Sequence, residues 1–301
     1  MKILCSEINT KEECRRFILN CERKFKDKLK SSAECALSRN NKVITLSGPT
    51  CSGKTTTAEL FVSEINRAGH NAVVLSIDDF YKDNLRRNLP PGAKPDFDSV
   101  KTIDTDYLAE FTDRLLLGKS VRIPRFNFLT GVRDGYTEYV PQEKDIYIFE
   151  GIQAVYPEVV SLFGEKYTSI FICVGDSVSV NGVAFSSYEI RLLRRLVRDS
   201  LFRNASASFT LSCWESVREN EDSAIFPNAQ NPDVYIDSFL EYELFMIGKF
   251  ALPMLSEIGR GEPYADIAED LSERLREIDN PVFDTSLVPR DSMFREFIGK
   301  I

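Results

Sequence analysis

The fold of this chain of 301 residues is decided by nine consecutive residues: Gly48, Pro49, Thr50, Cys51, Ser52, Gly53, Lys54, Thr55 and Thr56. They follow the apolar run of residues 43–46 and precede a helical pattern over residues 57–65. The stretch fits the pattern G-x-x-x-x-G-K-[ST], whose backbone N–H groups and lysine surround a phosphate. The order of strand, glycine-rich turn and helix predicts a phosphate-binding loop and favours it over a chance match in an ordinary turn.

Short apolar runs and helical patterns alternate along the chain, which is typical of a parallel sheet covered by helices on both faces. Strands are expected at residues 43–46, 72–75, 145–149, 169–173 and 233–237. Helices are expected at residues 56–68, 104–117 and 187–203. Residues 84–100 and 177–187 have the composition of loops. We therefore expect an α/β fold of the P-loop NTPase type, a three-layer α/β/α sandwich with a mostly parallel sheet and a helical lid.

The composition excludes several classes of protein. The net charge is −8, and a nucleic-acid surface needs clustered basic residues instead. No apolar run approaches the length of a membrane span. The seven cysteines include no C-x-x-C pair and there is one histidine, so neither a disulfide framework nor a zinc site is expected. Free thiols favour a cytoplasmic location.

Acidic residues follow two of the expected strands at the edge where ligands of open α/β sheets bind. Asp78 and Asp79 come directly after the second strand, where a carboxylate could orient an acceptor hydroxyl and accept its proton. The alternative is that one of them only caps the next turn.

Glu150 ends the third strand and is followed by Gly151. A carboxylate there could hold Mg²⁺ together with the Thr55 hydroxyl, while Lys54 would reach the β- and γ-phosphates of ATP. The alternative is a surface acid at a strand end. The phosphate loop upstream favours the metal role.

The helix expected at residues 187–203 carries the densest arginine cluster of the chain. Arg191, Arg194, Arg195 and Arg198 recur at spacings of three and four and are expected to share one broad face. Such a face is commonly solvated. In a chain that is net acidic, however, it is more consistent with a lid whose arginines neutralise a phosphoryl group in transfer.

These residues resemble the uridine kinase–phosphoribulokinase family over roughly residues 40–258. Besides the phosphate loop, residues 76–81 resemble its S-x-D-x-F-Y segment, and Phe97 with Asp98 resembles its F-D step. Residues 149–152 are similar to its F-E-G-I motif, and residues 194–199 to its R-R-x-x-R-D lid. Residues 124–133, 214–218, 225–227 and 233–237 are most similar to a bacterial, uridine kinase-like branch of nucleoside kinases.

The resemblance implies a role for each matching residue. Asp78 would be the base on a sugar 5′-hydroxyl, and Tyr81 would line the substrate site. Asp98 and Arg195 would hold the ribose hydroxyls, and Arg198 and Arg203 would close over the phosphates. Three further candidate substrate contacts lie in residues 124–133: Phe126, Phe128 and Arg133.

The chain is expected to divide into three parts. Residues 1–40 would form an amphipathic helical extension, residues 41–262 the kinase domain with a lid around residues 177–230, and residues 263–301 a helical tail. The N-terminal helix is expected to dock on its own domain, with pairing of two copies as the alternative.

The expected activity is transfer of a phosphoryl group from Mg·ATP to the 5′-hydroxyl of a nucleoside, uridine or cytidine first. Family members that read a pyrimidine use polar residues where this chain has Phe126, Gly131 and Ala205. A kinase of another small alcohol, such as a sugar phosphate, pantothenate or glycerate, is therefore an alternative. A second alternative is a nucleotide-binding regulator without turnover. A GTPase is disfavoured because no N-K-x-D motif is present.

Overall fold

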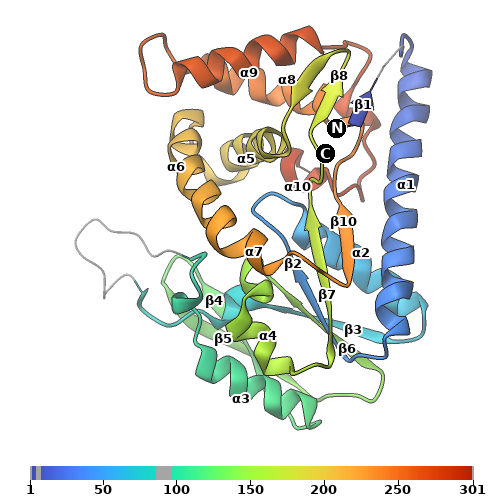
Figure 1. Ribbon diagram of the computed structural model, residues 1–301, viewed down its shortest axis with the longest axis vertical. Coiled ribbons are helices and arrows are strands. Elements are labelled where there is room, and N and C mark those ends of the chain that lie inside the picture. The colour runs from blue at the N-terminus through green and yellow to red at the C-terminus, as the bar shows by residue number, and fades with distance from the viewer. Residues whose placement is uncertain (1, 5–7, 86–96, 300–301) are drawn as a thin grey trace.

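The computed structural model describes residues 2–4, 8–85 and 97–299, and a five-stranded parallel sheet lies at its centre (Figure 1). The strands are ordered β10, β7, β2, β6 and β3 across this sheet. They are the five that the sequence predicts: β2 (Val43–Ser47), β3 (Asn71–Ser76), β6 (Asp145–Glu150), β7 (Tyr167–Cys173) and β10 (Val234–Asp237). The expected α/β fold of the P-loop type is confirmed.

The two faces of the sheet are covered by different helices, because side chains alternate along each strand. On β6, Ile146 and Ile148 belong to the cluster that contains Phe61 of α2 (Lys54–Arg67). Tyr147 and Phe149 belong instead to a cluster with side chains of α3 (Thr105–Leu116) and α4 (Pro157–Val160). This arrangement gives three layers and places the carboxyl ends of β2, β3 and β6 at one edge of the sheet.

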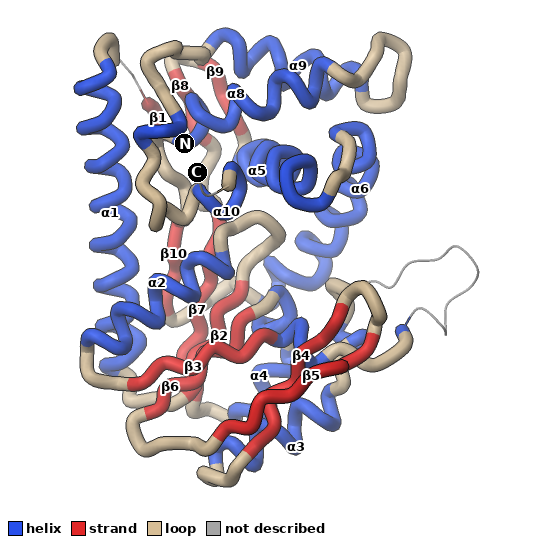
Figure 2. The backbone as a smooth tube through the Cα atoms, turned by 180° about the vertical axis from the view of Figure 1, so that it is seen from behind, coloured by secondary structure: helices blue, strands red, loops and turns tan. Residues whose placement is uncertain are grey.

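The long helix α1 (Lys11–Ser38) begins with a capping box formed by Thr10 and Glu13. Its apolar face packs into the same cluster as α2 and the sheet, so it docks on its own chain (Figure 2). The C-terminal elements contribute to this cluster as well: α8 (Glu243–Ser256), α9 (Ala265–Glu277) and α10 (Arg295–Ile298). The two ends of the chain thus share one hydrophobic core with the phosphate-loop region.

Residues 177–187 are not a loop, contrary to the expectation from composition. They contain β8 (Val178–Val180) and β9 (Val183–Phe185), which pair antiparallel with each other. Strand β1 (Lys2–Leu4) pairs parallel with β8 to complete a small sheet. Asn181 and Gly182 join β8 to β9 with left-handed φ values of +51° and +93°, the local signal of a two-residue hairpin turn. The pairing with β1 leaves no such sign, because β1 lies near residue 3.

The sequence reasoning also missed the antiparallel pair β4 (Val121–Asn127) and β5 (Val132–Tyr139). Helix α5 (Ser187–Arg203) forms as expected and is followed by α6 (Ala207–Asn220). A π-helical turn (Glu221–Ile225) and α7 (Phe226–Asn228) come next. Among the described helices, none combines the length and apolarity that a membrane crossing requires.

Candidate active site

A cavity of about 690 Å³ opens at the carboxyl edge of the central sheet. Residues 50–55 of the phosphate loop line it, which brings six of the nine loop candidates together. The other candidates that line it are Asp78, Tyr81, Asp98, Phe128, Glu150, Arg195, Arg198 and Arg203. The cavity is large enough for small-molecule ligands, whose sites usually span about 300–1,000 Å³.

The phosphate loop joins β2 to α2 and passes close against β7. A Cβ atom on Gly48 would lie 2.0 Å from the Ile172 carbonyl oxygen, so only glycine fits there. Gly53 precedes α2 with a left-handed φ of +91°, which glycine adopts without strain. The Lys54 ammonium donates to the carbonyl oxygens of Gly48 at 2.9 Å and Pro49 at 3.0 Å. Gly48 and Pro49 thus support the loop from behind without lining the cavity.

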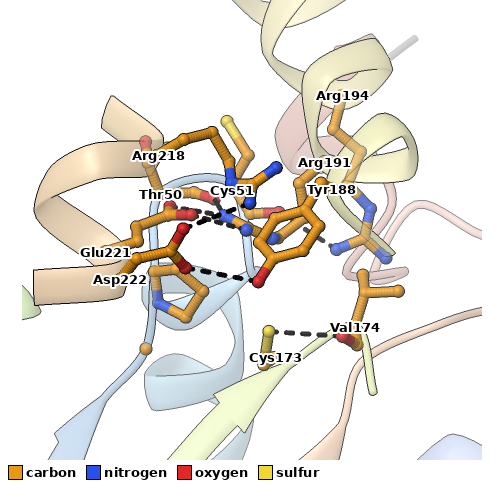
Figure 3. A network of polar contacts seen from close by, with 12 residues as sticks. Thr50, Cys51, Cys173, Val174, Tyr188, Arg191, Arg194, Arg218, Glu221 and Asp222 are labelled. Atoms are coloured by element: carbon orange, nitrogen blue, oxygen red, sulfur yellow. Dashed lines mark hydrogen bonds and ion pairs between the residues drawn. The ribbon is translucent and has the colours of Figure 1, made fainter. Parts of the chain in front are cut away.

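Two arginines of α5 hold the phosphate loop from the protein interior (Figure 3). Arg191 donates to the Thr50 carbonyl oxygen at 3.1 Å, and Arg194 donates to the Cys51 carbonyl oxygen at 3.1 Å. Their exposed fractions are 0% and 1%, so the expectation that all four arginines neutralise a phosphoryl group from a lid is wrong for these two. Because the C=O and N–H of a trans peptide point in opposite directions, fixing these carbonyls also fixes the following N–H groups.

Each buried guanidinium is paired with a buried carboxylate. Arg191 contacts both carboxylate oxygens of Glu221, at 2.5 and 2.6 Å, and Arg194 contacts both of Glu243, at 3.0 and 2.8 Å. The Arg191–Glu221 pair is bidentate, because two guanidinium nitrogens each donate to one oxygen, and such pairs are directional as well as strong. In the Arg194–Glu243 pair, one guanidinium nitrogen donates to both oxygens. Glu221 lies in the π-helical turn, a type of irregularity that recurs at functional sites.

The other arginines of α5 face the cavity around a single carboxylate, Asp199. Arg198 donates to it at 2.7 Å, Arg195 lies 3.3 Å from it and Arg203 lies 3.5 Å from it. Asp199 is 5% exposed, so its charge is well placed to orient all three guanidinium groups. The structure therefore places a cluster of positive charge opposite the phosphate loop.

Asp78 lies in the 3-10 turn of residues 77–80 that follows β3, within a hydrogen-bonded chain. The Tyr81 hydroxyl lies 2.9 Å from the Asp78 carboxylate and 2.7 Å from the Phe97 carbonyl oxygen. The Gln153 amide donates to the Tyr81 hydroxyl oxygen at 3.0 Å. Burial raises the pKa of Asp78 above its ordinary value, although the Tyr81 hydrogen bond and the charge of Lys54 oppose that rise.

Asp79 has a different position from its neighbour. Its carboxylate accepts the backbone N–H of Phe126 at 2.9 Å and so fastens the β4–β5 hairpin to the end of β3. Asp79 does not line the cavity, whereas Asp78 does. Of the two carboxylates that the sequence offered, Asp78 therefore faces the cavity and Asp79 has a structural role.

Glu150 and the Thr55 hydroxyl both line the cavity and offer the oxygen ligands that Mg²⁺ prefers. Burial raises the pKa of Glu150 to about 7, Lys54 opposes this rise, and the negative charges of Asp78 and Glu296 add to it. A cation would relieve that repulsion. No group of three or more His, Cys, Asp or Glu side chains in the described residues is arranged to hold a metal. Mg²⁺ needs only one or two carboxylates when waters and phosphates complete its shell, so the residues fit.

The aromatic candidates form one cluster around Tyr81. The ring centroids of Phe97 and Phe126 lie 5.0 and 5.4 Å from that of Tyr81, and Phe128 lies 5.6 Å from Phe97. Phe128 lines the cavity, whereas Phe126 is 6% exposed and supports it from behind. Arg133 does not line the cavity. It pairs at 2.8 Å with Asp104, the N-cap residue of α3.

Sequence reasoning missed three residues that shape the site. Gln153 lies three residues beyond Glu150, and Asp199 ends the R-R-x-x-R-D motif, so both had a motif nearby as a signal. Glu296 lines the cavity from the C-terminal segment and accepts hydrogen bonds from Thr56. No motif indicates Glu296, because its segment is far from the loop in sequence.

Parts of this chain are similar in sequence to known proteins. The model of the phosphoribulokinase/uridine kinase family matches residues 43–244. A uridine kinase of Staphylococcus aureus (strain JH9) is 28% identical over 196 residues, which cover 64% of this chain and 86% of that protein.

Two solved structures are similar to parts of the chain. A protein from Silicibacter sp. TM1040 that was assigned as a fructose transport system kinase has 19% identity and a TM-score of 0.49. The match covers 69% of this chain and 98% of that one. A D-glycerate 3-kinase from Cryptococcus neoformans has 14% identity and a TM-score of 0.35, over 89% of this chain and 87% of that one.

The buried pair of Arg191 and Glu221 yields a stability prediction. Glu221→Ala leaves the Arg191 charge buried without its carboxylate, so the free energy of unfolding should fall by about 3–5 kcal/mol. Urea denaturation measures this loss. The control is Glu269→Ala, which removes an exposed partner of Arg260 and should change stability by less than about 1 kcal/mol. Equal losses of stability in the two variants would contradict the conclusion that Glu221 neutralises a buried charge.

Proposed function

Because the chain belongs to the phosphoribulokinase/uridine kinase family, it is a phosphotransferase, and we propose that it phosphorylates the 5′-hydroxyl of a nucleoside with Mg·ATP. Uridine and cytidine are the first substrates to consider. The observation that supports this most is the position of Asp78, which lies in the same cavity as Lys54 and the phosphate loop. A base beside a phosphate site is the arrangement that transfer to a hydroxyl requires.

Asp78 would accept the proton of the acceptor hydroxyl. Its raised pKa makes it a stronger base than an ordinary aspartate, and Tyr81 keeps the carboxylate oriented. Transfer of a phosphoryl group needs little covalent help from the protein, so most of the rate comes from positioning and charge neutralisation.

The loop and the arginines would bind the donor. The N–H groups of the phosphate loop and Lys54 would hold the β- and γ-phosphates, and Arg195, Arg198 and Arg203 would neutralise charge on the transferring group. Thr55 and Glu150 would hold Mg²⁺, which supplies positive charge to the phosphate oxygens.

The acceptor side of the cavity supports a sugar. Asp98 offers carboxylate acceptors and Arg195 offers guanidinium donors, a combination that suits two neighbouring hydroxyls. Phe128 and Phe97 supply aromatic surface for a planar base. A role in the salvage of nucleosides and a cytoplasmic location are part of the same proposal. The seven cysteines of the chain fit a reducing compartment, where thiols stay free.

A kinase of another small alcohol is the second candidate. Its support is that Phe126 is buried and that neither Gly131 nor Ala205 lines the cavity, so these positions supply no polar group to read a base. A phosphorylated acceptor would need additional basic residues near residues 84–100. Lys82 there donates to the Lys101 carbonyl oxygen, whereas Arg86, Arg87 and Lys94 lie outside the described residues.

Asp78→Asn tests the base. The variant keeps its size but loses the proton acceptor, so turnover should fall by about 10²–10⁴-fold while ATP affinity stays nearly unchanged. Steady-state kinetics measures turnover, and calorimetric titration measures affinity. The control is Asp79→Asn, whose remaining carbonyl oxygen can still accept the Phe126 N–H, so most activity should remain. Full activity of Asp78→Asn would exclude Asp78 as the base.

Tyr81→Phe tests the orientation of that base through pH. The Tyr81 hydroxyl stabilises the ionised carboxylate, so its removal should raise the pKa of Asp78 further. The base must be deprotonated to act, so the acidic limb of the pH profile of kcat/KM should move to higher pH. Tyr156→Phe is the control, because Tyr156 donates to the backbone of Asp98 instead. An unchanged acidic limb in Tyr81→Phe would show that Asp78 does not govern it.

A substrate screen tests the acceptor class. The purified protein with Mg·ATP is offered nucleosides, sugar phosphates, pantothenate and glycerate, and ADP release is compared with the background without acceptor. We expect a response to one or a few nucleosides. A response only to a non-nucleoside would favour the second candidate. Silence across the panel with ATP still bound would favour a regulator without turnover.

A further inference from the structure

The carboxylate of Glu296 is bonded to the start of the phosphate-loop helix. One of its oxygens accepts the backbone N–H of Thr56 at 3.2 Å and the Thr56 hydroxyl at 2.9 Å. Thr56 is the third residue of α2, where backbone N–H groups have no partner within the helix. These are the donors that bind anions at such helix starts. A carboxylate therefore occupies a position that suits a phosphate oxygen.

The segment that carries Glu296 is anchored in the core. Phe294, which precedes α10, and Phe297 within it are fully buried. The Arg295 guanidinium donates to the carbonyl oxygens of Thr285, Val288, Pro289 and Gly299. The Phe297 ring lies 4.8 Å from the Arg194 guanidinium, which itself holds the phosphate loop. Glu296 is thus presented to the loop by a fixed element.

The same segment covers the start of α2. Met293 is fully buried, and its sulfur would lie 2.5 Å from a Cβ atom placed on Gly53. The charge of Glu296 also reaches across the cavity, since it contributes to the electrostatic environment of both Glu150 and Arg198. A negative group at this position opposes the approach of a triphosphate.

We propose that Glu296 is an autoinhibitory residue, whose carboxylate occupies an anion position of the phosphate loop and must leave Thr56 when the triphosphate of the donor binds. This inference rests on the proposed function of the loop as the ATP site. A ligand that must displace an existing partner binds with reduced apparent affinity, because only the state with the position open accepts it. Since α10 is anchored, the displacement is a movement of the Glu296 side chain.

A purely structural role for Glu296 predicts an effect on stability alone. Gly53 has no side chain to cap α2, so Glu296 also serves as a capping acceptor supplied from elsewhere in the chain. A cap that stays in place when ATP binds affects stability only. An inhibitory carboxylate affects the affinity for ATP, which makes affinity the quantity to measure.

The experiment is calorimetric titration of Mg·ATP into the wild type, Glu296→Gln and Glu296→Ala, with circular dichroism to verify folding. Both variants remove the charge, and only the glutamine keeps an acceptor of the same length. The control is Glu273→Gln, which removes the charge of an exposed glutamate on α9. We expect both Glu296 variants to bind Mg·ATP on the order of tenfold more tightly, and the control to match the wild type.

The outcomes separate this inference from the proposed function. If the wild type and the Glu296 variants bind Mg·ATP equally well, or the variants bind it more weakly, the inhibitory role is overturned while the ATP site stands. If neither the wild type nor any variant binds Mg·ATP, both the inference and the proposed function fail. Binding that appears only in the Glu296 variants supports both.

Discussion

Two buried ion pairs fix the geometry on which the site depends. Arg191 and Arg194 lie in the interior with almost no exposure, and each donates both to a carbonyl of the phosphate loop and to a buried glutamate. A charge that is removed from water costs several kcal/mol unless it is well paired, so each guanidinium requires its loop carbonyl and its carboxylate in place. The loop, α5, the π-helical turn and α8 are thereby fixed relative to one another, and the positive φ of Cys51 is held by this arrangement.

The buried ion pairs divide the arginines of α5 into two groups with different roles. Arg191 and Arg194 face inward to the loop, whereas Arg195 and Arg198 face the cavity and are oriented by Asp199. The body of the helix cannot swing away from the loop without breaking the buried pairs, so it forms a fixed wall of the site. Val217 of α6 also lines the cavity, so α6 contributes to its wall.

The parts of the structure that could be predicted are those whose cause is local in sequence. Each strand of the central sheet is an apolar run, and the phosphate loop is a contiguous motif, so the fold class and the carboxyl-edge position of Asp78 and Glu150 followed directly. The hairpin of β8 and β9 had a local signal that the sequence reasoning did not use, the Asn181-Gly182 dipeptide of a two-residue turn. The pairing of β8 with β1 could not be predicted, because β1 lies near residue 3, far from β8 in sequence. The burial of Arg191 was hidden for the same reason: an arginine at helical spacing indicates an exposed face unless its partner, here thirty residues away, is known. Glu296 could not be predicted either, because its segment matches no motif and its partner Thr56 is far away in sequence.

The cavity contains many groups suited to phosphate, and the protein satisfies several of them internally. Lys54 donates to carbonyls of its own loop, the arginines of α5 bond to Asp199, and Thr56 bonds to Glu296. Buried donors without partners are costly, so a site that waits for an anion needs such substitutes. Binding of a triphosphate then becomes an exchange of partners, in which the new hydrogen bonds are offset by those that are lost. The net affinity is lower than the number of donors suggests, and the internal bonds from Lys54, Arg191 and Arg194 hold the phosphate loop in shape between ligands.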